Sequence, residues 1–107
     1  MENVEVITLS VTGNTTGRAY TGTFKAKALL TRRDQFAADL KRREIIGSVS
    51  PESAMPALVG EAFIIGQLAV RIVESPEWWS ASNGGLDLQD ANVSEDLFRL
   101  ALEAEQK

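Results

Sequence analysis

Hydrophobic and polar residues alternate along the first 30 residues in a pattern typical of β-strands. From Val4 to Val11 the apolar residues are mostly β-branched, and their alternation changes phase around Val6-Ile7, which indicates a β-bulge or a strand covered on both faces. After a polar stretch with two glycines, residues 12–18, a second alternating run contains Tyr20 and Phe24. The pattern predicts an antiparallel β-hairpin whose Tyr20 and Phe24 side chains face the core.

A first helix is predicted from about Arg32 to Ile46. Thr31 and Asp34 have the spacing of a capping box, in which a hydroxyl and a carboxylate satisfy free amides at the helix start, and Gly47 follows as a stop signal. Four apolar residues define the face that we expect to turn toward the core: Phe36, Ala37, Leu40 and Ile45.

Two further helices are predicted in the second half of the chain. One begins near Ser53, ends before Ser75-Pro76 and is apolar around most of its circumference, so we expect it at the centre of the core. Its small residues permit close approach of another backbone: Gly60, Ala62, Gly66 and Ala69. The other helix follows a capping pattern at residues 92–95, and its apolar residues recur at helical spacing nearly to residue 107.

These elements predict an α+β fold in one domain, residues 1–107, with an N-terminal antiparallel β-hairpin packed on about three α-helices. Residues 1–30 form the hairpin and residues 31–107 the helical part. Between the last two helices lies a loop rich in tryptophan and glycine, residues 76–92, without a linker long enough to divide the chain.

Composition narrows the possible chemistry. The 107 residues are 44% hydrophobic and 24% charged, as in an average globular protein, and include neither cysteine nor histidine. Disulfides, thiolate nucleophiles, zinc sites of the usual kind and imidazole catalysis are therefore excluded. No pair of carboxylates is nominated by spacing for catalysis, so we expect no enzymatic activity and no cofactor. The N-terminus does not resemble a signal peptide, and the apolar stretch at residues 57–73 is interrupted by polar side chains, so no membrane association is expected.

Two clusters of charged residues have alternative interpretations. Asp87, Asp90, Asn92 and Glu95 could supply oxygen ligands to a calcium ion, but they lack the spacing of an EF-hand, and helix capping with loop hydrogen bonds is the favoured interpretation. Five basic residues in the first helix could contact phosphates: Arg32, Arg33, Lys41, Arg42 and Arg43. Because the formal net charge is -4, a solvated helix face is favoured and no nucleic-acid binding is expected.

The adjacent Trp78 and Trp79 are the leading candidates for a partner-binding site. In an extended segment their side chains point to opposite sides, so one could pack inward while the other meets a partner. Tryptophan is enriched in interface hot spots, although packing of both rings over the core is equally compatible with the sequence. The predicted partner-binding residues are Trp78, Trp79, Leu86, Asp87, Leu88, Asp90 and Asn92.

Several motifs in order resemble small proteins of tailed bacteriophages. They are Tyr20-Thr21-Gly22-Thr23-Phe24-Lys25-Ala26-Lys27, Leu30-Thr31-Arg32-Arg33-Asp34, Arg42-Arg43-Glu44-Ile45-Ile46-Gly47, Gln67-Leu68-Ala69-Val70-Arg71-Ile72, Ser75-Pro76-Glu77-Trp78-Trp79 and Gly84-Gly85-Leu86-Asp87-Leu88-Gln89-Asp90-Ala91-Asn92-Val93. The series is similar to tail assembly chaperones and virion structural proteins, and the likeness covers nearly the whole chain.

The resemblance implies a role in phage morphogenesis through protein–protein binding. Tail assembly chaperones bind the long helical tape-measure protein and help tail-tube subunits to gather around it. On this basis we expect the chain to act in the host bacterial cytoplasm during assembly, with the tape measure or with tail or capsid subunits as partners and with possible homo-oligomers. The alternative is a permanent structural component of the virion, in the head or the tail.

Overall fold

A computed structural model describes residues 4–46 and 56–105 of the chain. The first two elements are β1 (Val4–Thr12) and β2 (Ala19–Lys27), which pair as an antiparallel hairpin from Val4 opposite Lys27 to Thr12 opposite Ala19. This pairing has no register shift, so the bulge considered in the first strand is absent from the hairpin. The phase change instead reflects an apolar residue on the outer face of the sheet, because Val6 lies on the face away from the helices and is 63% exposed.

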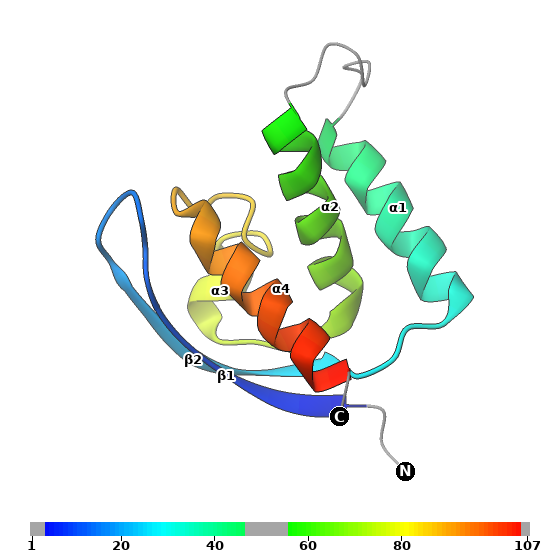
Figure 1. Cartoon of the computed structure of the whole chain (residues 1–107), viewed down its shortest axis with the longest axis horizontal. Coiled ribbons are helices and arrows are strands. Elements are labelled where there is room, and N and C mark those ends of the chain that lie inside the picture. The colour runs from blue at the N-terminus through cyan, green and yellow to red at the C-terminus, as the bar shows by residue number, and fades with distance from the viewer. Residues whose placement is uncertain (1–3, 47–55, 106–107) are drawn as a thin grey trace.

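The helices all lie on one side of the sheet (Figure 1). They are α1 (Arg32–Ile46), α2 (Pro56–Arg71), α3 (Glu77–Ala81) and α4 (Ala91–Glu105). Helix α4 packs on the hairpin and on α2, and α1 packs along α2 at the outside of this layer. The α+β prediction, with an N-terminal hairpin on about three longer helices, is therefore confirmed.

A short third strand, β3 (Ile72–Glu74), follows α2 without a break and was not predicted. It pairs antiparallel with β2, which gives the strand order β1-β2-β3, and Lys25 and Glu74 form an ion pair across this edge at 3.3 Å. The long apolar run therefore changes from helix to strand at Ile72, whereas periodicity predicted one helix up to Ser75. The predicted helix start near Ser53 lies outside the described residues.

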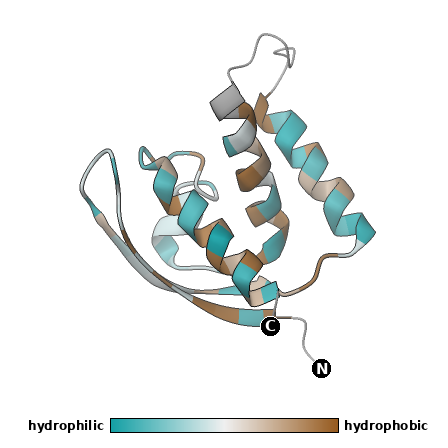
Figure 2. Cartoon of the chain, viewed as in Figure 1, coloured by the Kyte–Doolittle hydropathy of each residue, from teal (hydrophilic) through white to brown (hydrophobic). Residues whose placement is uncertain are grey.

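The core lies between the hairpin and the helices. The predicted inward face of the hairpin is confirmed, because Tyr20 and Phe24 are both buried. The other members of the central cluster are Ile7, Leu9, Ala26, Leu68, Trp79, Val93, Leu97 and Ala101. Helix α2 is the most hydrophobic of the helices in Figure 2. Among its residues whose burial is described, Leu68 belongs to this cluster and Ile64 packs against it, while the hairpin and α4 supply most of the other members. None of the helices in these ranges is long and apolar enough to cross a membrane.

Helix α1 begins as the sequence predicts. The Thr31 hydroxyl accepts a hydrogen bond from the Asp34 amide at 3.1 Å, and the Asp34 carboxylate accepts one from the Thr31 amide at 3.0 Å. This is the reciprocal pattern of a capping box. Lys27 at the end of β2 also binds Asp34 at 3.0 Å, so the carboxylate connects the sheet to the helix start. The hydrogen bond from the Thr31 amide and that from Lys27 lower the pKa of Asp34.

Candidate functional site

The tryptophan pair lies on α3 rather than on an extended loop. Side chains that are adjacent in a helix point about 100° apart, so both rings can reach the hairpin. Trp79 is 4% exposed and packs edge-to-face on Phe24 with 5.7 Å between ring centroids. Trp78 is half-buried, lies 5.2 Å from the Tyr20 ring and donates a hydrogen bond from Nε1 to the Thr21 carbonyl oxygen at 2.9 Å. The expectation of opposite directions is therefore wrong.

The glycine-rich loop after α3 is shaped around Trp79. Asn83, Gly84 and Gly85 all have positive φ angles, of 56°, 67° and 94°. A Cβ on Gly85 would lie 2.7 Å from the Trp79 ring, so this position also requires the absence of a side chain. Leu86, at the outside of the loop, is 43% exposed.

Asp90 holds the turn between β1 and β2. One carboxylate oxygen accepts hydrogen bonds from the Thr15 and Thr16 amides, at 2.7 and 2.8 Å. The other accepts hydrogen bonds from the Thr16 hydroxyl at 2.6 Å and the Tyr20 hydroxyl at 2.7 Å. The carboxylate is fully buried. The hydrogen bond from the Thr16 hydroxyl, followed by those from Tyr20 and the amides, holds the pKa of Asp90 well below its ordinary value, against the opposing effect of burial.

Asn92 completes this clamp on the turn. Helix α4 begins at Ala91, so Asn92 lies in the first turn and is not the helix cap that the sequence predicted. Its side-chain oxygen accepts a hydrogen bond from the Asn14 amide, and its Nδ2 donates one to the Thr12 carbonyl oxygen, both at 2.9 Å. The carboxylates considered for calcium are not gathered into one site, and the described part of the chain contains no group of three acidic side chains able to hold a metal ion.

The predicted partner-binding residues are therefore divided between the interior and the surface. Trp79 and Asp90 are buried and offer no area to a partner in this structure. Leu88 is half-buried and packs against the core. Leu86 and Asp87 remain exposed at the end of the loop, so partner binding by these two residues stays a prediction.

Phe36 and Leu40 of α1 are among the most exposed large apolar side chains of the described residues, although the sequence predicts that they face the core. Ala38 is the buried residue of α1. Phe36 and Leu40, each two residues from Ala38, lie about 200° around the helix and point away from α2. They are 70% and 58% exposed. The expectation that Phe36 and Leu40 face the core is therefore wrong.

The close contact between α1 and α2 explains this orientation. A Cβ on Gly66 of α2 would lie 2.7 Å from the Ala38 carbonyl oxygen and 3.3 Å from the Arg42 amide nitrogen. Only the small-residue side of α1 fits against a helix at this distance, so the bulky residues must turn outward. The prediction that Gly66 permits close approach of another backbone is confirmed, whereas around Gly60 the described atoms leave open space.

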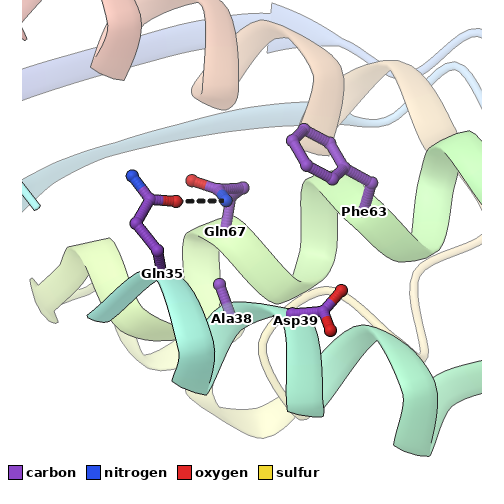
Figure 3. A pocket seen from close by; sticks show the side chains of 5 residues that line it. All are labelled: Gln35, Ala38, Asp39, Phe63 and Gln67. Atoms are coloured by element: carbon purple, nitrogen blue, oxygen red, sulfur yellow. Dashed lines mark hydrogen bonds between the residues drawn. The ribbon is translucent and has the colours of Figure 1, made fainter. Parts of the chain in front are cut away.

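Beside this contact, α1 and α2 enclose a shallow hollow of about 200 Å³ (Figure 3). It is lined by Gln35, Ala38 and Asp39 from α1 and by Phe63 and Gln67 from α2. The Gln67 side chain donates a long hydrogen bond of 3.5 Å to the Gln35 side-chain oxygen across the hollow. Its lining thus combines polar side chains with the apolar surface of Ala38 and the exposed Phe63 ring.

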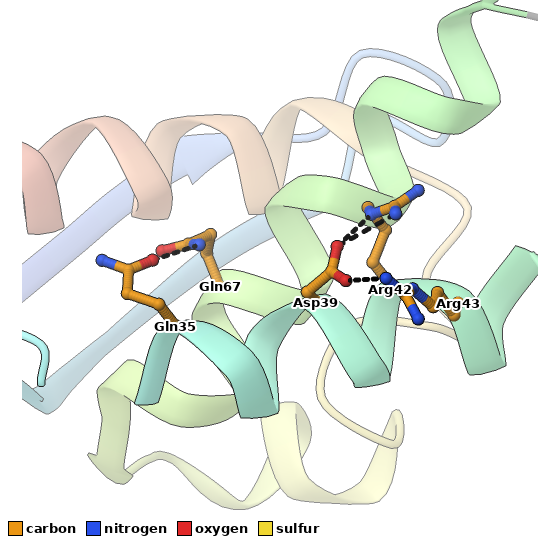
Figure 4. Close-up of polar contacts among 5 residues, drawn as sticks. All are labelled: Gln35, Asp39, Arg42, Arg43 and Gln67. Carbon is orange, nitrogen blue, oxygen red and sulfur yellow. Dashed lines mark hydrogen bonds and ion pairs between the residues drawn. The ribbon is translucent and has the colours of Figure 1, made fainter. Parts of the chain in front are cut away.

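Asp39, at the rim of the hollow, is shared by two arginines (Figure 4). It binds Arg42 at 2.9 Å and Arg43 at 2.8 Å. The hydrogen bond from Arg42 and the charges of both guanidinium groups lower the pKa of Asp39. Helix α1 contains five basic and three acidic residues, so it retains a net positive charge on a protein whose formal net charge is -4.

Comparison of the chain with protein-family models, with curated proteins and with solved structures finds no match. The outward face of α1 presents two large apolar side chains, Phe36 and Leu40, to solvent. We use the term α1 stripe for Arg33, Phe36, Leu40 and Arg43, which follow one another at intervals of three or four residues on the outer side of the helix. All four are exposed.

Proposed function

We propose that this protein is a bacteriophage morphogenesis factor that acts by binding other proteins, as a tail assembly chaperone does. The observation that supports binding is the α1 stripe, which presents Phe36 and Leu40 to solvent between arginine side chains. Exposed aromatic and aliphatic side chains with an arginine rim are typical of helix-docking surfaces. The assignment to phage assembly derives from the resemblance of the sequence motifs.

A permanent virion component is the second candidate, and a different observation favours it. Strand β1 is nine residues long and lies at the edge of the sheet, in the order β1-β2-β3. Its exposed Val6 adds apolar surface near this edge. An open edge strand can pair with a strand of a neighbouring subunit, as in the shells and tubes of many assemblies.

A mass-spectrometric inventory of infected cells and purified particles tests the proposal. The tagged protein is isolated from bacteria infected with the phage that encodes it, and co-purifying proteins are compared with those isolated with the Phe36→Ser variant. An assembly factor is expected to co-purify with tail or capsid proteins, to lose them in the variant and to be absent from mature particles. Stoichiometric amounts in purified particles would instead establish the virion component, and absence of any phage partner would refute both candidates.

A further inference from the structure

Helices α1 and α4 carry the same spacing of apolar and charged residues with opposite charges. The α1 stripe is Arg33, Phe36, Leu40 and Arg43. At the same intervals, α4 contains Glu95, Phe98, Leu102 and Glu105, which we call the α4 stripe. In both helices a phenylalanine and a leucine four residues apart lie between two charged residues, so the helices are complementary in charge and alike in shape along one face.

The α4 stripe also reaches the surface. Glu95 is exposed, Leu102 is 36% exposed and Phe98 is half-buried. Phe98 packs edge-to-face on Phe63 of α2 with 6.1 Å between ring centroids, and Phe63 is itself exposed, so the apolar area continues onto α2. Glu105 already binds the buried Arg71 at 2.9 Å, which leaves Glu95 as the α4-stripe carboxylate without an intrachain ion pair among the described residues.

We propose that the α1 stripe of one molecule docks on the α4 stripe of a second copy of this chain. Arg43 is already paired with Asp39, and Glu105 with Arg71, within the chain. The charges that remain for a partner are therefore Arg33 and Glu95, which face each other when the two helices run parallel. Pairing of two α1 stripes would oppose arginines, and pairing of two α4 stripes would oppose glutamates. The contact is therefore between different surfaces of the two molecules rather than between two copies of the same stripe.

A contact between different surfaces leaves one free stripe on each molecule of a pair. Within the chain α2 lies between α1 and α4, so the two stripes belong to different parts of the helical layer (Figure 1). Further copies can add at the free stripes, and the result is a closed ring or an open filament according to the rotation at each contact. This inference rests on the proposed function, because it names a second copy as one occupant of the α1 stripe.

Complementation between two variants tests the proposal. Phe36→Ser removes the α1 stripe and keeps the α4 stripe, whereas Leu102→Ser does the reverse. Analytical ultracentrifugation of the wild-type chain is expected to show a mass that rises with protein concentration and falls with added salt. Each variant alone is expected to associate about thirtyfold more weakly, as for loss of a hot-spot side chain. An equimolar mixture of the two is expected to form dimers and nothing larger.

Controls keep the outcomes distinct. Val6→Ser removes an equally exposed apolar side chain from the outer sheet face and is expected to leave the association unchanged. Arg33→Glu and Glu95→Arg each weaken association, and a mixture of the two restores it, which keeps the test valid if Leu102→Ser fails to fold. A wild-type chain that stays monomeric at every concentration overturns the proposal. The proposal is also overturned if the wild-type chain is monomeric and the Phe36→Ser variant no longer binds a phage protein. That result would leave the proposed function standing.

Discussion

Replacement of Gly66 by alanine tests the reason why α1 turns its bulky residues outward. The added Cβ would lie 2.7 Å from the Ala38 carbonyl oxygen, about 0.7 Å short of the 3.4 Å at which ordinary contact begins. The contact is with backbone, so it can be relieved only by moving α1 away from α2. Overpacking of this kind costs about 1 to 3 kcal/mol, against a gain of about 1 kcal/mol in helix propensity. We expect a net loss of up to about 2 kcal/mol.

Gly60→Ala is the matched control in the same helix. No described atom lies within 4 Å of a Cβ at this exposed position, so only the gain in helix propensity remains, and we expect stabilisation by about 1 kcal/mol. The two variants should thus differ by about 1 to 3 kcal/mol, which corresponds to a difference of at least about 4 °C in Tm for a domain of this size. Urea and thermal unfolding, followed by tryptophan fluorescence and circular dichroism, measure both values. Equal stability of the two variants would refute the close contact.

Three further predictions concern the clamp and the tryptophan pair. The lowered pKa of Asp90 means that the unfolded chain binds the proton more readily, so stability is expected to fall as the pH drops below the ordinary value of 3.8. Urea unfolding between neutral pH and pH 2.5 measures this loss, and the free energy of unfolding should depend less on pH in the Asp90→Asn variant. The same pH dependence in the variant and the wild-type chain would refute this role of Asp90. Trp79→Ala should cost about 3 to 5 kcal/mol of unfolding free energy, because it empties a core position. Trp78→Phe should cost about 1 kcal/mol through the lost hydrogen bond to the Thr21 carbonyl, and an equal cost for both tryptophan variants would contradict the different burial.

The elements that sequence reasoning identified correctly are those defined by local signals. The hairpin follows from alternation, and the start of α1 follows from the Thr31 and Asp34 capping box. Strand β3 carries no such signal, because its three residues continue the apolar run of α2 and become a strand only by pairing with β2. The local sequence pattern alone cannot show whether residues 72–74 continue the helix or form a strand.

The candidate site was predicted less well, for two physical reasons. The roles of Asp90 and Asn92 depend on partners more than 70 residues away in the chain, which no spacing within the motif reveals. The direction of Phe36 depends on Gly66 in a different helix, since hydrophobicity alone favours turning a phenylalanine inward. A run of small residues in α2 was the available signal, and it indicated close packing without indicating which side of α1 would meet it.

The clamp formed by Asp90 and Asn92 also affects the order in which the protein can fold during synthesis. The hairpin is made first, but its turn is held by side chains that the ribosome adds about 75 residues later. A two-stranded hairpin without its covering helix is at best marginally stable in water. The nascent N-terminal half therefore exposes Tyr20 and Phe24 until α4 has been made, and folding is completed by a long-range closure rather than by growth from the N-terminus. A chaperone that binds emerging apolar strands can act during this interval.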